Sequence, residues 1–190
     1  MLEPANARHL ALLRALIRQG AAEGSFDRAL AGESEEAAQF FDKLRRALVS
    51  GYFIEEDPRT GRIDTVAVPG YVFWPDDRTA GSAPIGFGLF RALEEGYELW
   101  LAGLDFARRG EGHGHALLTA LLSTPTGTRT YAVRVQRGSR YIATVTHLLA
   151  NLRFTAIGDT ERLRWFVRND APAPLAARIR ATLSAQRPVN

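Results

Sequence analysis

The chain has 190 residues, 46% of them hydrophobic and 24% charged, with 24 basic against 21 acidic side chains and no cysteine. These values fit a globular protein with one core and exclude wholesale disorder. No apolar run approaches the roughly 18 residues of a spanning helix, and the lack of cysteine excludes disulfides, thiolate metal sites and cysteine nucleophiles. The first residues lack the basic and apolar segments of a secretory signal, so we expect a cytoplasmic protein.

The net charge of +3 is unevenly distributed. Residues 129–168 carry eight arginines and two acidic residues, whereas residues 1–57 carry seven basic and ten acidic ones. Arginine suits phosphate groups because its planar fork can make two bonds at once, but a solvated surface has the same composition. The acidic first part would face a polyanion poorly, so we do not expect a nucleic-acid partner.

Two helices are predicted at the start of the chain. Apolar residues recur with helical spacing over residues 6–22, and glycines then break the pattern. The second helix begins at Ser34, a good N-cap, and ends at Gly51. Its apolar stripe consists of Phe40, Phe41, Leu44 and Leu48.

Strand patterns follow. We expect a hairpin from residues 52–54 and 63–68, a strand at 71–74, and two long strands at 85–93 and 97–105. The short turn at 94–96 requires the long strands to be antiparallel. The remaining chain predicts a helix after a glycine-rich turn, a strand at 129–137, a helix at 140–152, strands at 154–158 and 162–168, and a helix at 173–186. The intervening helix makes strands 97–105 and 129–137 parallel.

The glycine-rich turn, Arg109-Gly-Glu-Gly-His-Gly114, stands between a strand and a helix. Such a junction offers unpaired backbone N–H groups at the positive end of the helix dipole, and glycines let an anion approach closely. One tight turn needs fewer than three glycines, so we expect an anion site, most naturally for phosphate. The dinucleotide spacing fails because the sixth position from Gly110 is His115, and the P-loop Gly-Lys-Ser/Thr is absent.

The run Arg109-x-x-Gly112-x-Gly114 resembles the acetyl-CoA signature of the GNAT N-acetyltransferase superfamily, Gln/Arg-x-x-Gly-x-Gly/Ala. The order of predicted elements is similar to that family over residues 5–168. The resemblance implies a GNAT-like α+β (mixed α/β) fold: a central mixed, mostly antiparallel sheet, splayed at the signature strand and flanked by helices. We expect a single domain over residues 1–190, with a core at 5–168 and a helical tail at 172–190.

The resemblance also implies acetyl-CoA as cosubstrate. Backbone amides of Arg109, Gly110, Gly112, Gly114 and His115 would bind its pyrophosphate. Leu104 and Phe106, at the end of the signature strand, would pair their backbone with the pantetheine arm, and an amide near Leu104 would polarise the thioester carbonyl. The expected cofactor-binding residues are therefore Leu104, Phe106, Arg109, Gly110, Glu111, Gly112, His113, Gly114, His115 and Asn151.

Glu98 is the expected catalytic base. The attacking amine must be neutral, and a carboxylate can accept its proton, often through water. Some family members place a basic glutamate at this distance before the signature. Strand alternation predicts that the Glu98 side chain shares a face with Trp100, Ala102 and Leu104. The alternatives are a solvated glutamate without a role, and Asp105, on the other face, as the base.

The sequence departs from the family at the general acid. Many members carry a tyrosine on the helix after the next strand, followed by Gly-Phe, whereas here Leu149 stands in its place and Arg153-Phe154 replaces Gly-Phe. The thiolate would then leave unassisted or through water. Tyr141 lies too early in the chain to substitute, and we expect His147 to be structural.

Other side chains near the signature carry weaker indications. His113 and His115 lie beside Glu111, but alternation in a glycine turn points them apart, so we expect no metal. Four aromatic residues belong either to the core or to an acceptor pocket: Phe26, Tyr52, Tyr71 and Trp74.

Together these features predict an acetyl-CoA-dependent N-acetyltransferase that moves the acetyl group directly to a primary amine of a small molecule or peptide. The missing tyrosine leaves open a catalytically weak acyl-CoA-binding regulatory module, and the arginine-rich segment leaves open a tRNA-directed acetyltransferase toxin. Acidic residues favour a cationic amine; they are Asp27, Asp76, Asp77 and Glu98. We expect no membrane partner, and a homodimer is left open.

Overall fold

The computed structural model describes residues 1–56, 61–75, 82–123 and 129–185. Its helices are α1 (Leu10–Ala22), α2 (Glu35–Ser50), α3 (His113–Ser123), α4 (Ile142–Asn151) and α5 (Ala173–Ala185). Its strands are β1 (Leu2–Pro4), β2 (Tyr52–Glu56), β3 (Ile63–Ala67), β4 (Gly70–Phe73), β5 (Gly86–Ala92), β6 (Tyr97–Leu104), β7 (Thr130–Gln136), β8 (Phe154–Asp159) and β9 (Leu163–Arg168). All the predicted helices and strands are confirmed, and β1 is an addition. None of the helices in these ranges is long and apolar enough to cross a membrane.

Seven strands form one mixed sheet in the order β1-β4-β5-β6-β7-β9-β8, and β2 pairs with β3 in a separate hairpin. Only β6 and β7 are parallel among neighbouring described strands, as the crossover through α3 predicts. β1 pairs with β4 at the edge of the sheet. Its three residues are too few to show a strand periodicity, which is why the sequence did not predict it.

The ends of α2 follow the predicted capping chemistry. The Ser34 hydroxyl accepts a hydrogen bond from the Ala37 amide at 3.1 Å, which satisfies one of the free N–H groups of the first turn. Gly51 adopts a left-handed φ of 81° and donates its N–H to the Ala47 carbonyl at 2.7 Å. The helix therefore ends where the chain must turn into β2.

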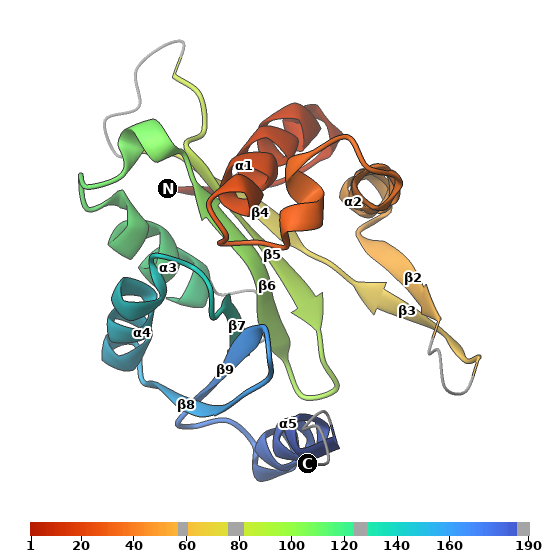
Figure 1. The fold of residues 1–190 in the computed structure, drawn as a ribbon, viewed down its shortest axis with the longest axis vertical. Helices are drawn as coiled ribbons and strands as arrows, with labels where there is room; N and C mark the ends of the chain where they lie inside the picture. Colours follow the sequence, from red (N-terminus) through yellow and green to blue (C-terminus); the bar gives the residue numbers. More distant parts are fainter. Residues whose placement is uncertain (57–60, 76–81, 124–128, 186–190) are drawn as a thin grey trace.

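Helices cover both faces of the large sheet (Figure 1). α1 and α2 pack on one face of β4, β5 and β6 through a core that includes Leu13, Ile17 and Phe87. α3 and α4 pack on the other face through a core that includes Leu121, Leu149 and Phe166. The two cores meet only across the sheet, so a side chain on β6 or β7 faces one helix pair or the other.

The C-terminal segment, expected as a tail, belongs to the packed structure. α5 buries Leu175, Ile179 and Leu183 against Ala132 of β7 and Val167 of β9. Arg178 of α5 also pairs with Glu94 and Glu95 in the turn before β6. At roughly 1.5–3 kcal/mol for each buried leucine or isoleucine side chain, this helix stabilises the β7–β9 end of the sheet.

The central feature of the sheet is the separation of β6 from β7. The two strands pair only where Tyr97 to Leu99 lie beside Thr130 to Val133. Beyond Leu99, β6 continues to Leu104 paired with β5 alone. This opening confirms the predicted splay at the strand before the glycine-rich turn.

A β-bulge on β6 changes which residues face which helices. Leu89 pairs with Leu101 and Phe90 with Leu99, so Trp100 is an extra residue on β6. Ala102 and Leu104 therefore pack toward α3 and α4. Glu98 pairs with Arg91, one position along from Leu99, on the α1 and α2 side. The expected shared face of Glu98 with Ala102 and Leu104 is wrong, because simple alternation does not survive an inserted residue.

Glycine at position 88 is required by the close packing of α3 on β5. A Cβ at Gly88 would lie 2.4 Å from Cδ2 of Leu121, which is itself buried. We predict that Gly88→Ala lowers the free energy of unfolding by about 1–3 kcal/mol, because the core cannot yield without strain. Gly32→Ala is the control, since no atom lies within 4 Å of a Cβ there. Equal urea midpoints for the two variants would contradict this packing.

Candidate active site

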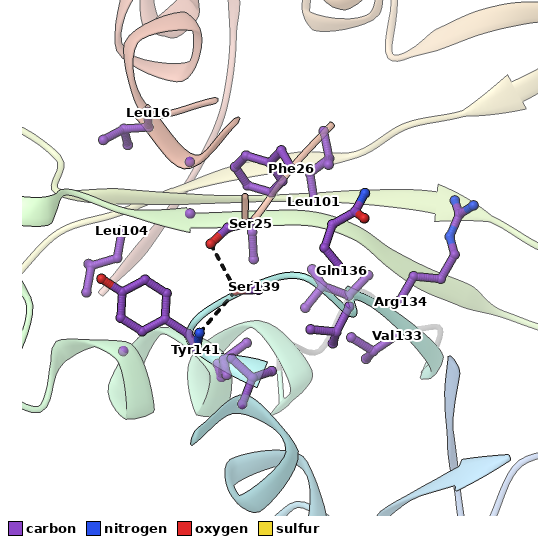
Figure 2. Close-up of a pocket in the computed structure, with 18 of the residues that line it drawn as sticks. Leu16, Ser25, Phe26, Leu101, Leu104, Val133, Arg134, Gln136, Ser139 and Tyr141 are labelled. Atoms are coloured by element: carbon purple, nitrogen blue, oxygen red, sulfur yellow. Dashed lines mark hydrogen bonds between the residues drawn. The ribbon is translucent and has the colours of Figure 1, made fainter. Parts of the chain in front are cut away.

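A cavity of about 730 Å³ lies where β6 and β7 separate. On the α3 and α4 side it is lined mainly by apolar residues: Leu104, Leu117, Leu118, Val133, Val145 and Leu148. On the α1 and α2 side its lining includes Phe26, Phe40, Leu101, Arg134 and Gln136. The cavity therefore passes through the plane of the sheet, and Figure 2 shows these walls on either side of β6 and β7.

The glycine-rich turn forms one end of this cavity. Gly110 and Gly114 belong to its lining, and α3 begins at His113. In the described residues, no acceptor receives a hydrogen bond from any of the five backbone N–H groups from Gly110 to Gly114, here called the amide row. Unpaired N–H donors at the positive end of a helix are the arrangement that anions bind in proteins, so the predicted role of the turn stays open to an anion.

Two of the amides predicted to face an anion are already bonded. The Arg109 N–H donates to the Phe106 carbonyl at 3.1 Å, and the His115 N–H donates to the Gly112 carbonyl at 3.1 Å. The expectation for these two amides is wrong, because the residues before and after the turn close short helical turns of their own. The free donors are limited to the amide row.

The three glycines of the turn meet different structural requirements. Gly110 and Gly112 have φ values of 87° and 83°, which other residues rarely adopt. Gly114 has no such φ, and among the described residues beyond its own neighbours no atom lies within 4 Å of the position that a Cβ would take. At Gly114 the missing side chain leaves open space at the cavity wall, which is what a ligand approaching the backbone needs.

Solved structures with the same topology identify the fold. An acetyltransferase assigned to the GNAT family from Bacteroides thetaiotaomicron gives a TM-score of 0.58 at 16% identity, over 97% of this chain and 96% of that one. A GNAT superfamily phosphinothricin acetyltransferase from Sinorhizobium meliloti, in complex with acetyl-CoA, gives 0.55 at 18%, over 88% and 86%. The PaiA N-acetyltransferase from Thermoplasma acidophilum, in complex with coenzyme A, gives 0.52 at 16%, over 88% and 98%.

This is the fold of the GNAT acetyltransferases. No family model and no curated protein sequence matches the chain. The predicted GNAT-like architecture is confirmed, although the three structures share only 16–18% of their residues with this chain.

Within this GNAT fold, the Arg109 side chain turns into the cavity and joins three segments. Its guanidinium pairs with Glu23 at the end of α1, donates to the Tyr141 hydroxyl at 2.8 Å, and donates to the Leu104 carbonyl at 3.2 Å. The guanidinium carbon also lies 4.8 Å from the centre of the Tyr141 ring. Figure 2 shows Tyr141 and Leu104 facing each other across this end of the cavity.

These contacts keep Arg109 charged. Burial lowers the pKa of the guanidinium, but hydrogen bonds with Glu23 and Tyr141 outweigh burial and raise that pKa above its usual value. Arg140 adds a second cation near Glu23, at 3.3 Å. The cavity end next to the amide row is therefore held by a fixed positive group.

Other side chains of the turn bond among themselves. Arg108 donates to Glu111 at 3.1 Å and contacts Nε2 of His113 at 3.2 Å. Glu111 and His113 are also 3.1 Å apart. No cluster of three metal-ligating side chains occurs in the part of the chain that the structure describes, and these local bonds account for Glu111 and His113.

Glu98 is buried beside the cavity and does not line it. Its side chain is 1% exposed and pairs with Nε of Arg134 on β7, which does line the cavity. Burial raises the pKa of Glu98, against the lowering effect of the Arg134 guanidinium. The residue on the cavity wall at this point is Arg134, and the Glu98 carboxylate lies behind it. Asp105, the alternative base, instead caps a short helical turn by accepting from the Ala107 amide.

Of the ten predicted cofactor-binding residues, four line the cavity and six do not: Phe106, Glu111, Gly112, His113, His115 and Asn151. Phe106 falls in a helical turn (Phe106–Arg108) after β6 has ended at Leu104, and its side chain is half exposed. Asn151 is exposed on α4 and contacts His147 at 3.3 Å. Leu149 is fully buried in the core, so α4 offers no hydroxyl at that position. The α4 residues on the wall are Thr144, Val145 and Leu148.

Several cavity residues were not singled out as site residues in the sequence, among them Phe40, Gln136 and Ser139. Ser25 and Ser139 share a hydrogen bond of 3.1 Å across the cavity, from the loop after α1 to the loop after β7 (Figure 2). The ring centres of Phe40 and Trp100 lie 5.9 Å apart on the cavity wall. Phe26 also lines the cavity, whereas the other three aromatic residues considered for an acceptor pocket do not. Arg134 and Gln136 alternate on β7, a pattern visible in the sequence, but their face depends on the opening of the sheet.

We predict that Arg109→Met lowers the free energy of unfolding by about 1–3 kcal/mol. The variant removes one of the two ion pairs of the partly buried Glu23 carboxylate and the hydrogen bond to the Leu104 carbonyl. Arg108→Met is the matched control, with an exposed pair typically contributing about 0–1 kcal/mol. Urea unfolding measures both. An Arg109 variant no less stable than the Arg108 variant would show that the three-segment link contributes nothing to folding.

Proposed function

We propose that this chain is an acetyl-CoA-dependent N-acetyltransferase that transfers the acetyl group directly to a primary amine. One observation carries the proposal: the two ends of the amide row, Gly110 and Gly114, line a cavity that crosses the sheet where β6 leaves β7. A phosphorylated cofactor bound at one end can present a reactive group to a substrate that enters from the other face.

The two halves of the cavity suit the parts of acetyl-CoA. The amide row supplies N–H donors for the pyrophosphate. The apolar wall of Leu117, Val145 and Leu148 suits the pantetheine arm, and the Leu104 carbonyl, although it accepts from Arg109, has a second lone pair for an amide of that arm. Two of the compared structures are complexes with acetyl-CoA or coenzyme A, which supports this assignment.

The reaction needs a neutral amine and an open path to the thioester. The amine nitrogen attacks the thioester carbonyl, the new C–N bond forms, the C–S bond breaks, and the thiolate leaves as the amine proton passes to a base. The chain has no cysteine, so no cysteine acyl-enzyme can intervene. We assign Glu98 as the base, acting through water, because the cavity wall at this point is Arg134 and not the carboxylate itself.

The arginine-rich segment gives little support to an RNA-directed enzyme. Of its eight arginines, seven form ion pairs with acidic residues in the described ranges: Arg129, Arg134, Arg137, Arg140, Arg162, Arg164 and Arg168. These ion pairs offset the charge of the segment and so weaken its long-range attraction for a polyanion. A small phosphorylated cofactor at the amide row accounts for the anion site without a polyanion.

Thiol release from acetyl-CoA with a panel of primary amines tests the proposal. Turnover with any amine, together with acetylated product by mass spectrometry, is the expected result. Binding of acetyl-CoA by calorimetry without thiol release from any amine would favour the regulatory module. Absence of acetyl-CoA binding would overturn the assignment of the cavity.

We predict that Gly114→Val weakens acetyl-CoA binding at least about tenfold. The new side chain fills the space beside the amide row, so the pyrophosphate can no longer accept all of its hydrogen bonds from these N–H groups. Gly32→Val is the matched control, since both positions have free space around a Cβ and neither has a positive φ. Calorimetry measures the dissociation constants, and thermal unfolding checks that both variants fold. Equal affinity in the two variants would place the pyrophosphate elsewhere.

We predict that Glu98→Gln lowers kcat by roughly 10²–10⁴-fold, the usual contribution of a general base. Burial raises the pKa of Glu98, so its ionised form accumulates only above that pKa. The kcat should therefore rise as the pH passes the pKa of Glu98, and this rise should be absent from the pH profile of Glu98→Gln. Glu36→Gln is the comparison, since Glu36 lines the cavity and has no ion pair among the described residues. A larger loss of kcat in Glu36→Gln than in Glu98→Gln, with the rise of kcat with pH kept in Glu98→Gln, would identify Glu36 as the base.

A further inference from the structure

Of the four carboxylates expected to attract a cationic acceptor, the two that the structure describes form ion pairs. Asp27 accepts from the Ala29 amide and lies 3.4 Å from Arg162, and Glu98 pairs with Arg134. Asp76 and Asp77 lie outside the described residues. Glu36, on the α2 side of the wall, has no ion pair among the described residues, so the described acceptor half combines one unpaired carboxylate with paired ones.

Arg134 presents unused donors to this half of the cavity. Its Nε is occupied by Glu98, and its guanidinium carbon lies 5.0 Å from the centre of the Trp165 ring. These two contacts fix the guanidinium, and neither terminal nitrogen has an acceptor among the described residues. A held guanidinium with free terminal nitrogens is a preformed receptor for a carboxylate.

Gln136 stands beside Arg134 on the same face of β7. Arg134 pairs with Trp165 and Gln136 with Leu163 on β9, so the two side chains are successive neighbours on one side of the sheet. Figure 2 shows both rising from β7 toward the side where Phe26 lies. The Gln136 amide lines the cavity and has no hydrogen-bond partner in the described part of the chain.

These donors are separate from the expected cofactor site. The amide row stands before α3, and the apolar wall that leads from it belongs to the α3 and α4 side. Arg134 and Gln136 belong to the opposite face, next to Phe26, Phe40 and Leu101. An anion at Arg134 would thus belong to the acceptor and not to the pyrophosphate.

We propose that Arg134 and Gln136 bind a carboxylate of the acceptor, so that the acceptor is an amino acid with an apolar side chain. The inference rests on the proposed acetyltransferase function and names its substrate class. The guanidinium and the amide NH₂ supply adjacent donors to one carboxylate. Phe26, Phe40 and Trp100 supply an aromatic wall for the apolar side chain, and the free amine remains to meet the thioester.

The experiment compares amino acids with the same molecules lacking the carboxylate. Thiol release from acetyl-CoA is measured with the twenty L-amino acids, and with phenethylamine and 3-methylbutylamine as the decarboxylated partners of phenylalanine and leucine. We expect at least one apolar amino acid to exceed its partner amine by about tenfold or more in kcat/KM, as a charged hydrogen bond implies. Equal or better turnover of the amines, or turnover of no amino acid, overturns the inference.

Variants locate the effect in the two side chains. Gln136→Leu keeps the size of the side chain and leaves the Glu98 pair intact, and it should raise KM for the amino acid several-fold while turnover of the partner amine stays within about twofold. Arg134→Met should lose roughly 10- to 100-fold in kcat/KM for the amino acid. Arg137→Gln, with its contacts to Asp159 and the Thr160 carbonyl, is the matched control and should leave both substrates unchanged.

The controls separate a failed inference from a failed function. Arg134→Met leaves Glu98 buried without its partner, so thermal unfolding accompanies each assay, and Gln136→Leu carries the test if that variant does not fold. Equal loss for amino acid and partner amine in Gln136→Leu would overturn carboxylate binding. The KM for acetyl-CoA should stay constant throughout, and calorimetric binding of acetyl-CoA to the wild type tests the cofactor site independently of any acceptor.

Discussion

The short pairing between β6 and β7 is the constraint on which the site depends. Three residues of β6 hold the two strands together, and the strand then leaves its neighbour while it remains bonded to β5. A continuous sheet would bring backbone and side chains together where the cavity lies. The cost of leaving strand edges unpaired is limited because the cavity can receive an extended ligand, and because Arg109 already bonds the Leu104 carbonyl.

The polar groups of the site fall into two sets: some bond to one another and fix the geometry, and others have no acceptor among the described residues. Near the turn, the amide row stays free while Arg109, Glu23 and Tyr141 lock the surrounding segments together. On the other face, Glu98 and Trp165 hold Arg134 with its terminal nitrogens uncommitted. In both places, bonded groups fix the geometry and unbonded donors face the cavity. Rigid presentation of a few free donors in an apolar space is what specific binding of a small anion requires.

Sequence patterns were sufficient for the fold because each element carries its own local code. The Ser34 cap, the Gly51 stop and the alternation over β7 reflect interactions within a few residues. The same patterns predicted the backbone geometry of the turn, since Gly110 and Gly112 have positive φ values, whereas the anion-binding role of these glycines stays a prediction. The face assigned to Glu98 was wrong because a bulge arises from pairing between strands, which no single-strand pattern records. The roles of Arg134 and Gln136 depend on that same long-range pairing.

The bulge at Trp100 makes β6 sensitive to length in a way that side-chain exchange does not capture. Removing Trp100 would restore regular alternation and leave Glu98, Ala102 and Leu104 on the faces that they have now, because Leu99 and Leu101 already face opposite helix pairs. The loss would fall on the Trp100 ring, whose centre lies 5.9 Å from that of Phe40 and 5.5 Å from that of Phe53. Adding or removing a residue in a regular part of β6 would instead turn every side chain beyond it to the other face. A gap placed at the bulge in an alignment of related chains would therefore mark a change in the acceptor half alone, whereas a gap elsewhere in β6 would mark a change in how both halves are assembled.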